Sequence, residues 1–258
     1  MMPKGQDRAF ELDFLRGITL CWVVIMHFTY DMRYIFSLNV FDYLDGQIYW
    51  TFWEPLVLSI FVGISGVCCT FSRNNMKRGL KLLIVGIVIT TATYFADKFF
   101  NLGCFILINV IHVLAISILL YSLISFIERK FKIDAVKVNI FMSFIGIWIM
   151  MVGTQIRRLH HTVSGNWLLP LGIYGKTVPT MGDYMPLIPW VGVFLVGAVI
   201  GRLCYKDRKS AFKDAPRAVK SFTRPFQFIG RHSLVIYLVH QPVVLGLSYL
   251  IFRLAGKV

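Results

Sequence analysis

Long apolar runs separated by short polar stretches dominate the pattern of this chain of 258 residues. Seven such runs can be read, and several reach about 20 residues, the length that spans the hydrocarbon core of a bilayer. Backbone polar groups in lipid must be satisfied within the segment, so each run is predicted to be a helix. The pattern therefore predicts an all-α, polytopic transmembrane helix bundle that forms a single domain over residues 1–258. The predicted spans are 14–34, 48–71, 80–96, 104–126, 138–156, 186–204 and 229–252.

Composition strengthens the membrane interpretation and changes the meaning of the charge. The chain is 57% hydrophobic, with a mean hydropathy of +0.66, more than soluble domains usually show. A formal net charge of +14 would suggest nucleic acid for a soluble protein. Here 19 lysines and arginines lie near the N-terminus and the loops after the second, fourth and sixth runs, and seven lie on the other side. Because basic loops stay cytoplasmic, the N-terminus is predicted inside and the C-terminus outside, and no nucleic-acid partner is expected.

Two loops stand out on the predicted topology. The longest inner loop, roughly 205–228, is basic and is expected to lie against anionic lipid headgroups. The longest outer loop, roughly 157–185, is rich in Gly, Pro and aromatic residues, and is expected to fold back over the outer mouth of the bundle. Small residues in "SIFVGISG" and "GAVIG" have the spacing that lets membrane helices pack closely.

Three histidines lie inside the apolar runs: His27, His112 and His240. A rise of about 1.5 Å per residue places all three roughly 17–20 Å from the inner edge of the membrane core, with His112 about eight residues inside the outer end of its run. Ionisable groups at this depth are costly and are usually functional. The alternative is that each is a packing histidine bonded to a neighbouring Ser, Thr or carbonyl. No carboxylate or cysteine shares the layer, so no metal site is expected.

A polar stripe follows one face of the first run. Arg16 and His27 are eleven positions apart, about three full turns of helix, so both point the same way. Asp13 and Asp31 lie one turn away from them on that face. Arg16 could simply snorkel to the headgroups and pair with Asp13, but His27 is too deep for that explanation.

An inner cation and a deep base on one wall suit a long anionic donor that enters from the cytoplasm. An acyl-coenzyme A has this shape, with a charged nucleotide, a slender arm and a terminal thioester. Basic side chains at the inner ends of the runs are candidates for its phosphates. The candidate donor-binding residues are Arg16, Asp13, Arg73, Lys77, Arg78, Lys81 and Arg231.

Several sequence blocks, in order and over nearly the whole chain, resemble one family. They are "ELDFLRGI" followed by His27, "FVGISG", "KRGLKLL", "INVIHVLAIS", "DYMPLIPWVGVFLVGAVIGR" and "GRHSLVIYLVHQP". These blocks resemble a bacterial membrane family grouped with the catalytic domain of heparan-α-glucosaminide N-acetyltransferase. The spacing of Arg16 and His27, and the late "GRHSLVIYLVH", also resemble the wider acyltransferase type 3 membrane family.

The resemblance implies transfer of an acetyl group from cytoplasmic acetyl-coenzyme A to an extracytoplasmic acceptor, usually a sugar, by a multi-pass protein of a bacterial cell membrane. Arg16 and His27 match the paired Arg and His of the wider family, and His112 and His240 match its later histidines. The family's lysosomal member has Asn at the position matching His27 and an essential histidine in the following loop, which has no histidine here. A heparan substrate is therefore not implied.

The predicted roles follow from the chemistry. His27 would act as general base, oriented by Asp31, while His240, Tyr237 or His112 would hydrogen-bond the thioester carbonyl. An acyl-histidine intermediate is the alternative to direct transfer. The residues expected to line the outer mouth on the acceptor side are Trp167, Asp183, Tyr184 and Trp190.

Two other classes of function fit the same residues. In a proton-coupled transporter the histidines and Asp31 would form a proton relay, although the inverted repeats typical of transporters are not visible. In a non-catalytic membrane subunit the fold would persist without chemistry. The sequence identifies neither the acceptor nor whether the chain forms a homo-oligomer.

Overall fold

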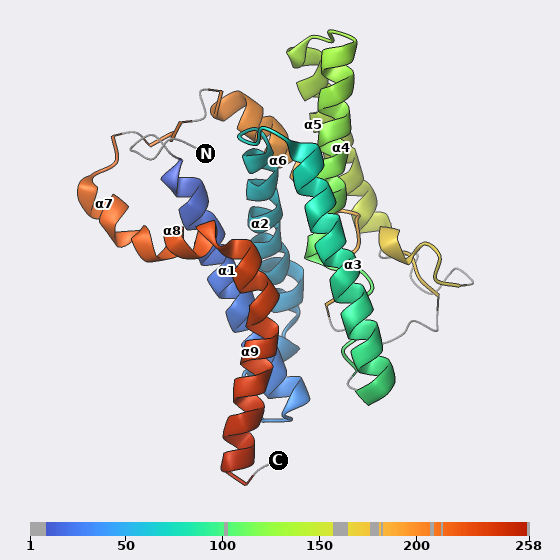
Figure 1. Ribbon diagram of the computed structural model, residues 1–258, viewed down its shortest axis with the longest axis vertical. Helices are drawn as coiled ribbons and strands as arrows, with labels where there is room; N and C mark the ends of the chain where they lie inside the picture. The colour runs from blue at the N-terminus through green and yellow to red at the C-terminus, as the bar shows by residue number, and fades with distance from the viewer. Residues whose placement is uncertain are drawn as a thin grey trace. The chain divides into compact units, whose positions relative to one another are not determined.

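The computed structural model describes residues 9–100, 103–156, 165–175, 181, 183–206, 209–212 and 214–256 (Figure 1). Within these ranges every regular element is helical. The chain divides into two compact units: unit 1 comprises Met1–Phe61 and Arg208–Val258, and unit 2 comprises Val62–Asp207. The single domain over residues 1–258 stays a prediction.

Six helical segments are long and apolar enough to cross a membrane, which confirms the predicted polytopic helical protein. The seventh predicted span forms the shorter helix α6 (Trp190–Cys204), which begins only after Pro189. The cytoplasmic position of the N-terminus stays a prediction. The six longer segments are Phe10–Ile35, Tyr49–Cys69, Asn75–Phe100, Val110–Lys130, Ala135–Ile156 and Ser233–Leu254.

Unit 1 is built on helix α1 (Phe10–Tyr30), which continues into a π-helical segment, η1 (Asp31–Ile35). Near the C-terminus, α7 (Arg217–Phe222) and α8 (Arg224–Arg231) lead into α9 (Ser233–Leu254). Figure 1 shows α8 running across α1 before α9 turns to follow it. The inner loop predicted over 205–228 is therefore helical from Arg217 onward.

The crossing of α1 and α8 depends on two glycines. A Cβ on Gly17 would overlap the carbonyl oxygen of Phe226, and a Cβ on Gly230 would overlap that of Asp13. The backbones of the two helices are therefore in direct contact, an approach that only residues without a side chain allow.

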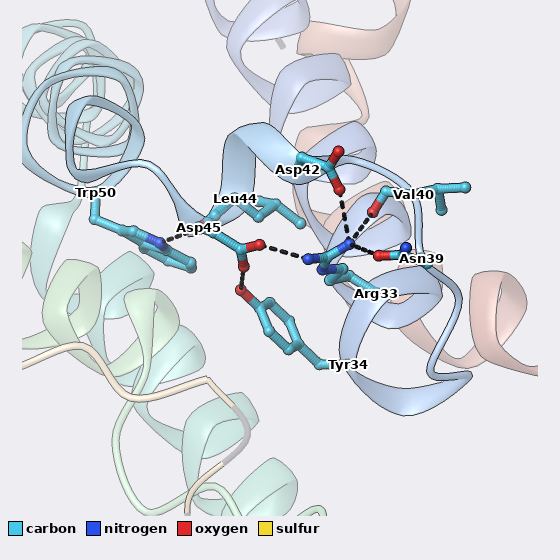
Figure 2. A network of polar contacts seen from close by, with 8 residues as sticks. All are labelled: Arg33, Tyr34, Asn39, Val40, Asp42, Leu44, Asp45 and Trp50. Atoms are coloured by element: carbon cyan, nitrogen blue, oxygen red, sulfur yellow. Dashed lines mark hydrogen bonds and ion pairs between the residues drawn. The ribbon is translucent and has the colours of Figure 1, made fainter.

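The chain turns from α1 towards α2 (Glu54–Cys69) through a compact loop that contains η2 (Asp42–Asp45) and the π-helical segment η3 (Tyr49–Trp53). Arg33 organises this loop, as Figure 2 shows: its guanidinium donates to Asn39 Oδ1 at 3.0 Å, to Asp42 Oδ1 at 2.8 Å and to Asp45 Oδ2 at 2.5 Å. The Tyr34 hydroxyl donates to the other oxygen of Asp45 at 3.1 Å. One arginine in η1 thus fixes the conformation of the loop that follows.

Unit 2 contains α3 (Asn75–Phe100), α4 (Val110–Lys130), α5 (Ala135–Ile156), α6 and the short η5 (Leu169–Leu171). The predicted close packing through small residues is confirmed between α2 and α6. A Cβ on Gly66 would overlap the carbonyl oxygen of Phe194, and one on Gly197 would overlap that of Gly63. Such contacts replace the hydrophobic driving force that is missing between helices in lipid.

The fourth predicted span, 104–126, began too early. Helix α4 starts at Val110, because the Asn109 side chain caps its first turn by accepting from the backbone N–H of Ile111 at 3.1 Å. His112 therefore lies in the first turn of its helix, so the predicted helix start at 104 was wrong, and its depth in the membrane stays a prediction.

Candidate functional site

The centre of unit 1 brings together two of the three predicted histidines. His27 on α1 and His240 on α9 have ring centroids 4.9 Å apart at an interplanar angle of 61°. His240 is buried, and its Nδ1 lies 2.6 Å from the carbonyl oxygen of Tyr237, one turn earlier. A carbonyl oxygen only accepts, so Nδ1 of His240 carries a hydrogen, and in the neutral ring Nε2 holds the lone pair.

A second polar pair lies one turn further along. Asp31 is only 1% exposed, and both of its carboxylate oxygens accept from the Gln241 amide nitrogen, at 3.0 and 3.1 Å. Asp31 is also the first residue of the π-helical segment, a feature that often marks functional sites. The Asp31 carboxylate is therefore held by Gln241, the residue directly after His240.

His27 differs from its neighbours in having no hydrogen bond to its ring within the described part of the chain. A base that is to take a proton from a substrate needs such a free nitrogen. The predicted stripe on α1 is thus the face that meets the C-terminal helices, with His27 against His240 and Asp31 against Gln241.

Sequence reasoning missed Gln241. The available signal was a polar side chain between a deep histidine and Pro242 in an otherwise apolar run. Pro242 lies inside α9 and lacks a backbone N–H, so it removes one helical hydrogen bond just after the two polar residues.

The other end of the stripe is fixed by charge. Asp13 forms an ion pair with Arg231, with 3.2 Å between Oδ2 and Nε. Two residues earlier, Glu11 accepts from the Ser210 hydroxyl at 2.7 Å and from the Ala211 N–H at 2.8 Å. Arg16 lies between these contacts and His27, and its Nη2 is buried without a hydrogen-bond partner in the ranges that the structure describes. Arg16 therefore has a buried cationic N–H that can donate a hydrogen bond to an anionic oxygen.

His112 belongs to unit 2, and both of its ring nitrogens have partners. Nδ1 lies 3.0 Å from Asn109 Oδ1 and 3.3 Å from the Asn109 backbone nitrogen, which completes the cap of α4. Nε2 lies 3.3 Å from the Thr90 hydroxyl on α3. The ring also packs on Gly86, where an added Cβ would come within 2.8 Å of Nε2. This geometry is the packing alternative considered from the sequence, and a catalytic role for His112 stays a prediction.

The predicted phosphate ligands of unit 2 lie around the start of α3. Arg73, Lys77 and Lys81 are exposed, while Arg78 is half-buried with Nη1 3.6 Å from Cys69 Sγ. Arg16 belongs to unit 1, so a phosphate site shared by all five residues stays a prediction.

The predicted acceptor-side residues occupy different environments of unit 2. Trp167 is 76% exposed, whereas Trp190 is buried at the start of α6. The Tyr184 hydroxyl donates to the Leu169 carbonyl at 2.6 Å, and burial raises the pKa of Tyr184 to about 12. Asp183 lies close enough to interact electrostatically with His112.

Parts of the predicted outer loop fold back onto the start of α4. The backbone N–H of Met185 donates to the Ile108 carbonyl at 3.1 Å, and that of Leu187 to the Pro170 carbonyl at 2.8 Å. Residues 157–164, 176–180 and 182 of the loop lie outside the described residues. Whether the loop acts as a lid stays a prediction.

Comparison with known proteins adds the chemistry that these groups could serve. Residues 8–242 match the family described as heparan-alpha-glucosaminide N-acetyltransferase, catalytic. No match was found to a curated protein or to a solved structure. Among the described residues, no group of three or more His, Cys, Asp or Glu side chains is placed to hold a metal ion. The matched family and the membrane helices together indicate acetyltransferase activity at a membrane, and the chain belongs to the family of the heparan-α-glucosaminide N-acetyltransferase catalytic domain.

Proposed function

We propose that this protein transfers an acetyl group from cytoplasmic acetyl-coenzyme A to a sugar, or another hydroxyl or amine acceptor, outside the cytoplasm. The family match over residues 8–242 supports acetyl transfer, and the six long apolar helices support a site within the membrane. The observation that carries the assignment is the His27–His240 pair, with Asp31 held beside it by Gln241.

In the proposed reaction His27 takes the proton of the acceptor hydroxyl or amine as its oxygen or nitrogen attacks the thioester carbonyl carbon. The carbon–sulfur bond then breaks, and the proton passes to the sulfur of coenzyme A. Asp31, one turn from His27, stabilises the imidazolium that forms in between. Burial strengthens this electrostatic help because less water competes for the charges.

Negative charge develops on the thioester oxygen during the attack and needs a hydrogen-bond donor. His240 can donate from Nε2 in its imidazolium form, because its Nδ1 hydrogen is already held by the Tyr237 carbonyl. The hydroxyl of Tyr237 is the second candidate and His112 the third.

The donor's phosphates are assigned to the basic residues at the predicted cytoplasmic ends of the helices. Arg16 is the strongest of these, since its buried Nη2 has no partner within the described residues and a guanidinium binds phosphate oxygens well. Asp13, with its partner Arg231, would position Arg16 from one turn away. The exposed Arg73, Lys77 and Lys81, with Arg78, would attract the nucleotide.

The test uses the full chain in detergent or nanodiscs. Release of the coenzyme A thiol from acetyl-coenzyme A is measured with an amino sugar, a neutral sugar or no acceptor. We expect acceptor-dependent release, and a rise in Tm with coenzyme A alone. If millimolar acetyl-coenzyme A gives no thiol release and millimolar coenzyme A gives no rise in Tm, acetyl transfer is contradicted. A transporter or a non-catalytic subunit would then be the better assignment.

A further inference from the structure

We propose that the segment before α9 is a docking surface for an anionic phospholipid leaflet. The segment, here called the platform, comprises residues 209–212 and 214–231 and includes α7 and α8. It would lie in the headgroup region with aromatic side chains inserted among the acyl chains and arginines at the phosphates. This inference goes beyond the proposed function, because it concerns neither donor nor acceptor.

The platform combines exposed aromatic and basic side chains. Phe222 is 76% exposed and Phe228 63%, and both lie outside the six long apolar segments. The described platform carries five basic residues and one acidic residue, and Arg217 and Arg224 are both exposed. An amphipathic helix with aromatic residues and a basic polar face is the type that lies in the membrane interface.

The position of the platform on α1 agrees with that depth. Its backbone touches α1 at Asp13 and Gly17, three to seven residues after the helix begins at Phe10. The contact therefore falls at the predicted inner end of the first span, 14–34. Interfacial helices lie at this boundary between headgroups and acyl chains, with their apolar face buried by about 5–10 Å.

Contacts on both flanks hold the platform at this level. Glu11 binds Ser210 and Ala211 at its start, and Asp13 pairs with Arg231 at its end. Lys220 lies 5.9 Å from the centre of the Phe10 ring. The next residues, from Ser233, enter the membrane-spanning helix α9, so the platform is continuous with the bilayer-facing part of unit 1.

The charge selects the lipid. Basic residues near a membrane surface are attracted by phosphatidylserine, phosphatidylglycerol and other anionic headgroups, and this attraction falls off within a Debye length. In a leaflet with neutral headgroups the phenylalanines could still insert, but Arg217 and Arg224 would not be attracted to the surface. The platform therefore fits a leaflet that contains anionic phospholipid.

Spin labels test the insertion directly. In a background without the native cysteines, Phe222→Cys and its neighbour Ser221→Cys are labelled in nanodiscs of phosphatidylcholine with phosphatidylglycerol. Neighbouring helical residues point about 100° apart, so Ser221→Cys is a matched control. We expect the spin label at 222 to collide with lipid-dissolved oxygen and to be shielded from a water-soluble nickel complex. The label at 221 should be accessible to the nickel complex and less accessible to oxygen. Equal exposure of both labels to nickel would overturn the proposal.

Charge neutralisation tests the lipid with native cysteines in place. We expect phosphatidylglycerol to raise the Tm of the parent protein above its value in pure phosphatidylcholine nanodiscs. The variant Arg217→Gln/Arg224→Gln should lose most of that rise, while Arg129→Gln/Lys132→Gln, in another basic loop, should keep it. Equal losses in both variants, or none in either, would contradict docking by the platform. Neither experiment measures acetyl transfer, so a failure here is distinct from a failure of the proposed function.

Discussion

Unit 1 and unit 2 each contain a buried histidine arrangement, and the two differ in how local groups satisfy the rings. In unit 2, Asn109 and Thr90 occupy both nitrogens of His112, and Gly86 leaves the ring just enough room. In unit 1, His27 meets another histidine and has no hydrogen bond to its ring within the described part of the chain. A histidine whose nitrogens cap a helix stabilises that helix, whereas a ring left without such bonds is available to a substrate.

The largest effect is expected from removing the histidine of unit 1 whose ring has no hydrogen bond among the described residues. We expect His27→Ala to lower acetyl-transfer kcat/KM by about 10²- to 10⁴-fold, the usual contribution of a general base. The rise in Tm caused by coenzyme A should remain, because His27 does not bind the phosphates. The matched control is His232→Ala, which removes an exposed histidine from the same unit. Undiminished activity of His27→Ala would remove the assigned base.

Gln241→Leu sharpens the assignment of Asp31. The change keeps the volume and removes the amide that donates to both carboxylate oxygens. Hydrogen bonds to a charged group are worth about 1.5–3 kcal/mol, so we expect kcat to fall at least about 10-fold. KM for acetyl-coenzyme A should change little, because Gln241 positions Asp31 and does not touch the donor. An unchanged kcat with a lower Tm would reduce Gln241 to a structural residue.

His112→Ala probes the unit 2 side of the comparison. The ring is replaced by a methyl group, so Asn109 and Thr90 lose their partner, and we expect the free energy of unfolding to fall by about 1–3 kcal/mol. Thermal unfolding in the same detergent measures this loss. The rate per folded molecule decides the predicted catalytic role: a loss as large as that of His27→Ala would assign His112 to the chemistry.

Tyr184→Phe is expected to have the smallest effect. Losing the hydrogen bond to the Leu169 carbonyl should cost about 1 kcal/mol near neutral pH. The pKa of Tyr184 is raised to about 12 in the folded protein, against about 10 when unfolded. The stabilising contribution is therefore complete below pH 10 and is lost as the pH rises from 10 towards 12. A stability difference between parent and variant that persists unchanged above pH 10 would contradict this.

The sequence predicted the membrane helices well because length and hydropathy alone decide them. It also predicted which face of the first helix carries the polar groups, since helical phase is fixed by residue number. The start of α4 was missed by six residues, because the apolar run continues through the loop before the Asn109 cap.

Partners across helices could not be predicted in the same way. Depth placed His27 and His240 in one layer, but their contact also requires the rotation of α9, which α8 sets where it crosses α1 at Gly17 and Gly230. Asp13 had an obvious neighbour in Arg16, yet it pairs with Arg231, which is 218 positions away in the chain. Such pairs depend on tertiary packing, which the local sequence pattern does not encode.

The glycine contact between α1 and α8 also has a mechanical consequence. Backbone atoms touch at Gly17 and Gly230, so the helices cannot slide past one another without first separating, and rotation about the contact is the remaining motion. His27 lies ten residues beyond Gly17 on the continuous helix α1, an arm of about 15 Å. A tilt of about 4° at this fulcrum would move the His27 ring by about 1 Å relative to His240, a misplacement large enough to cost about 10²-fold in rate.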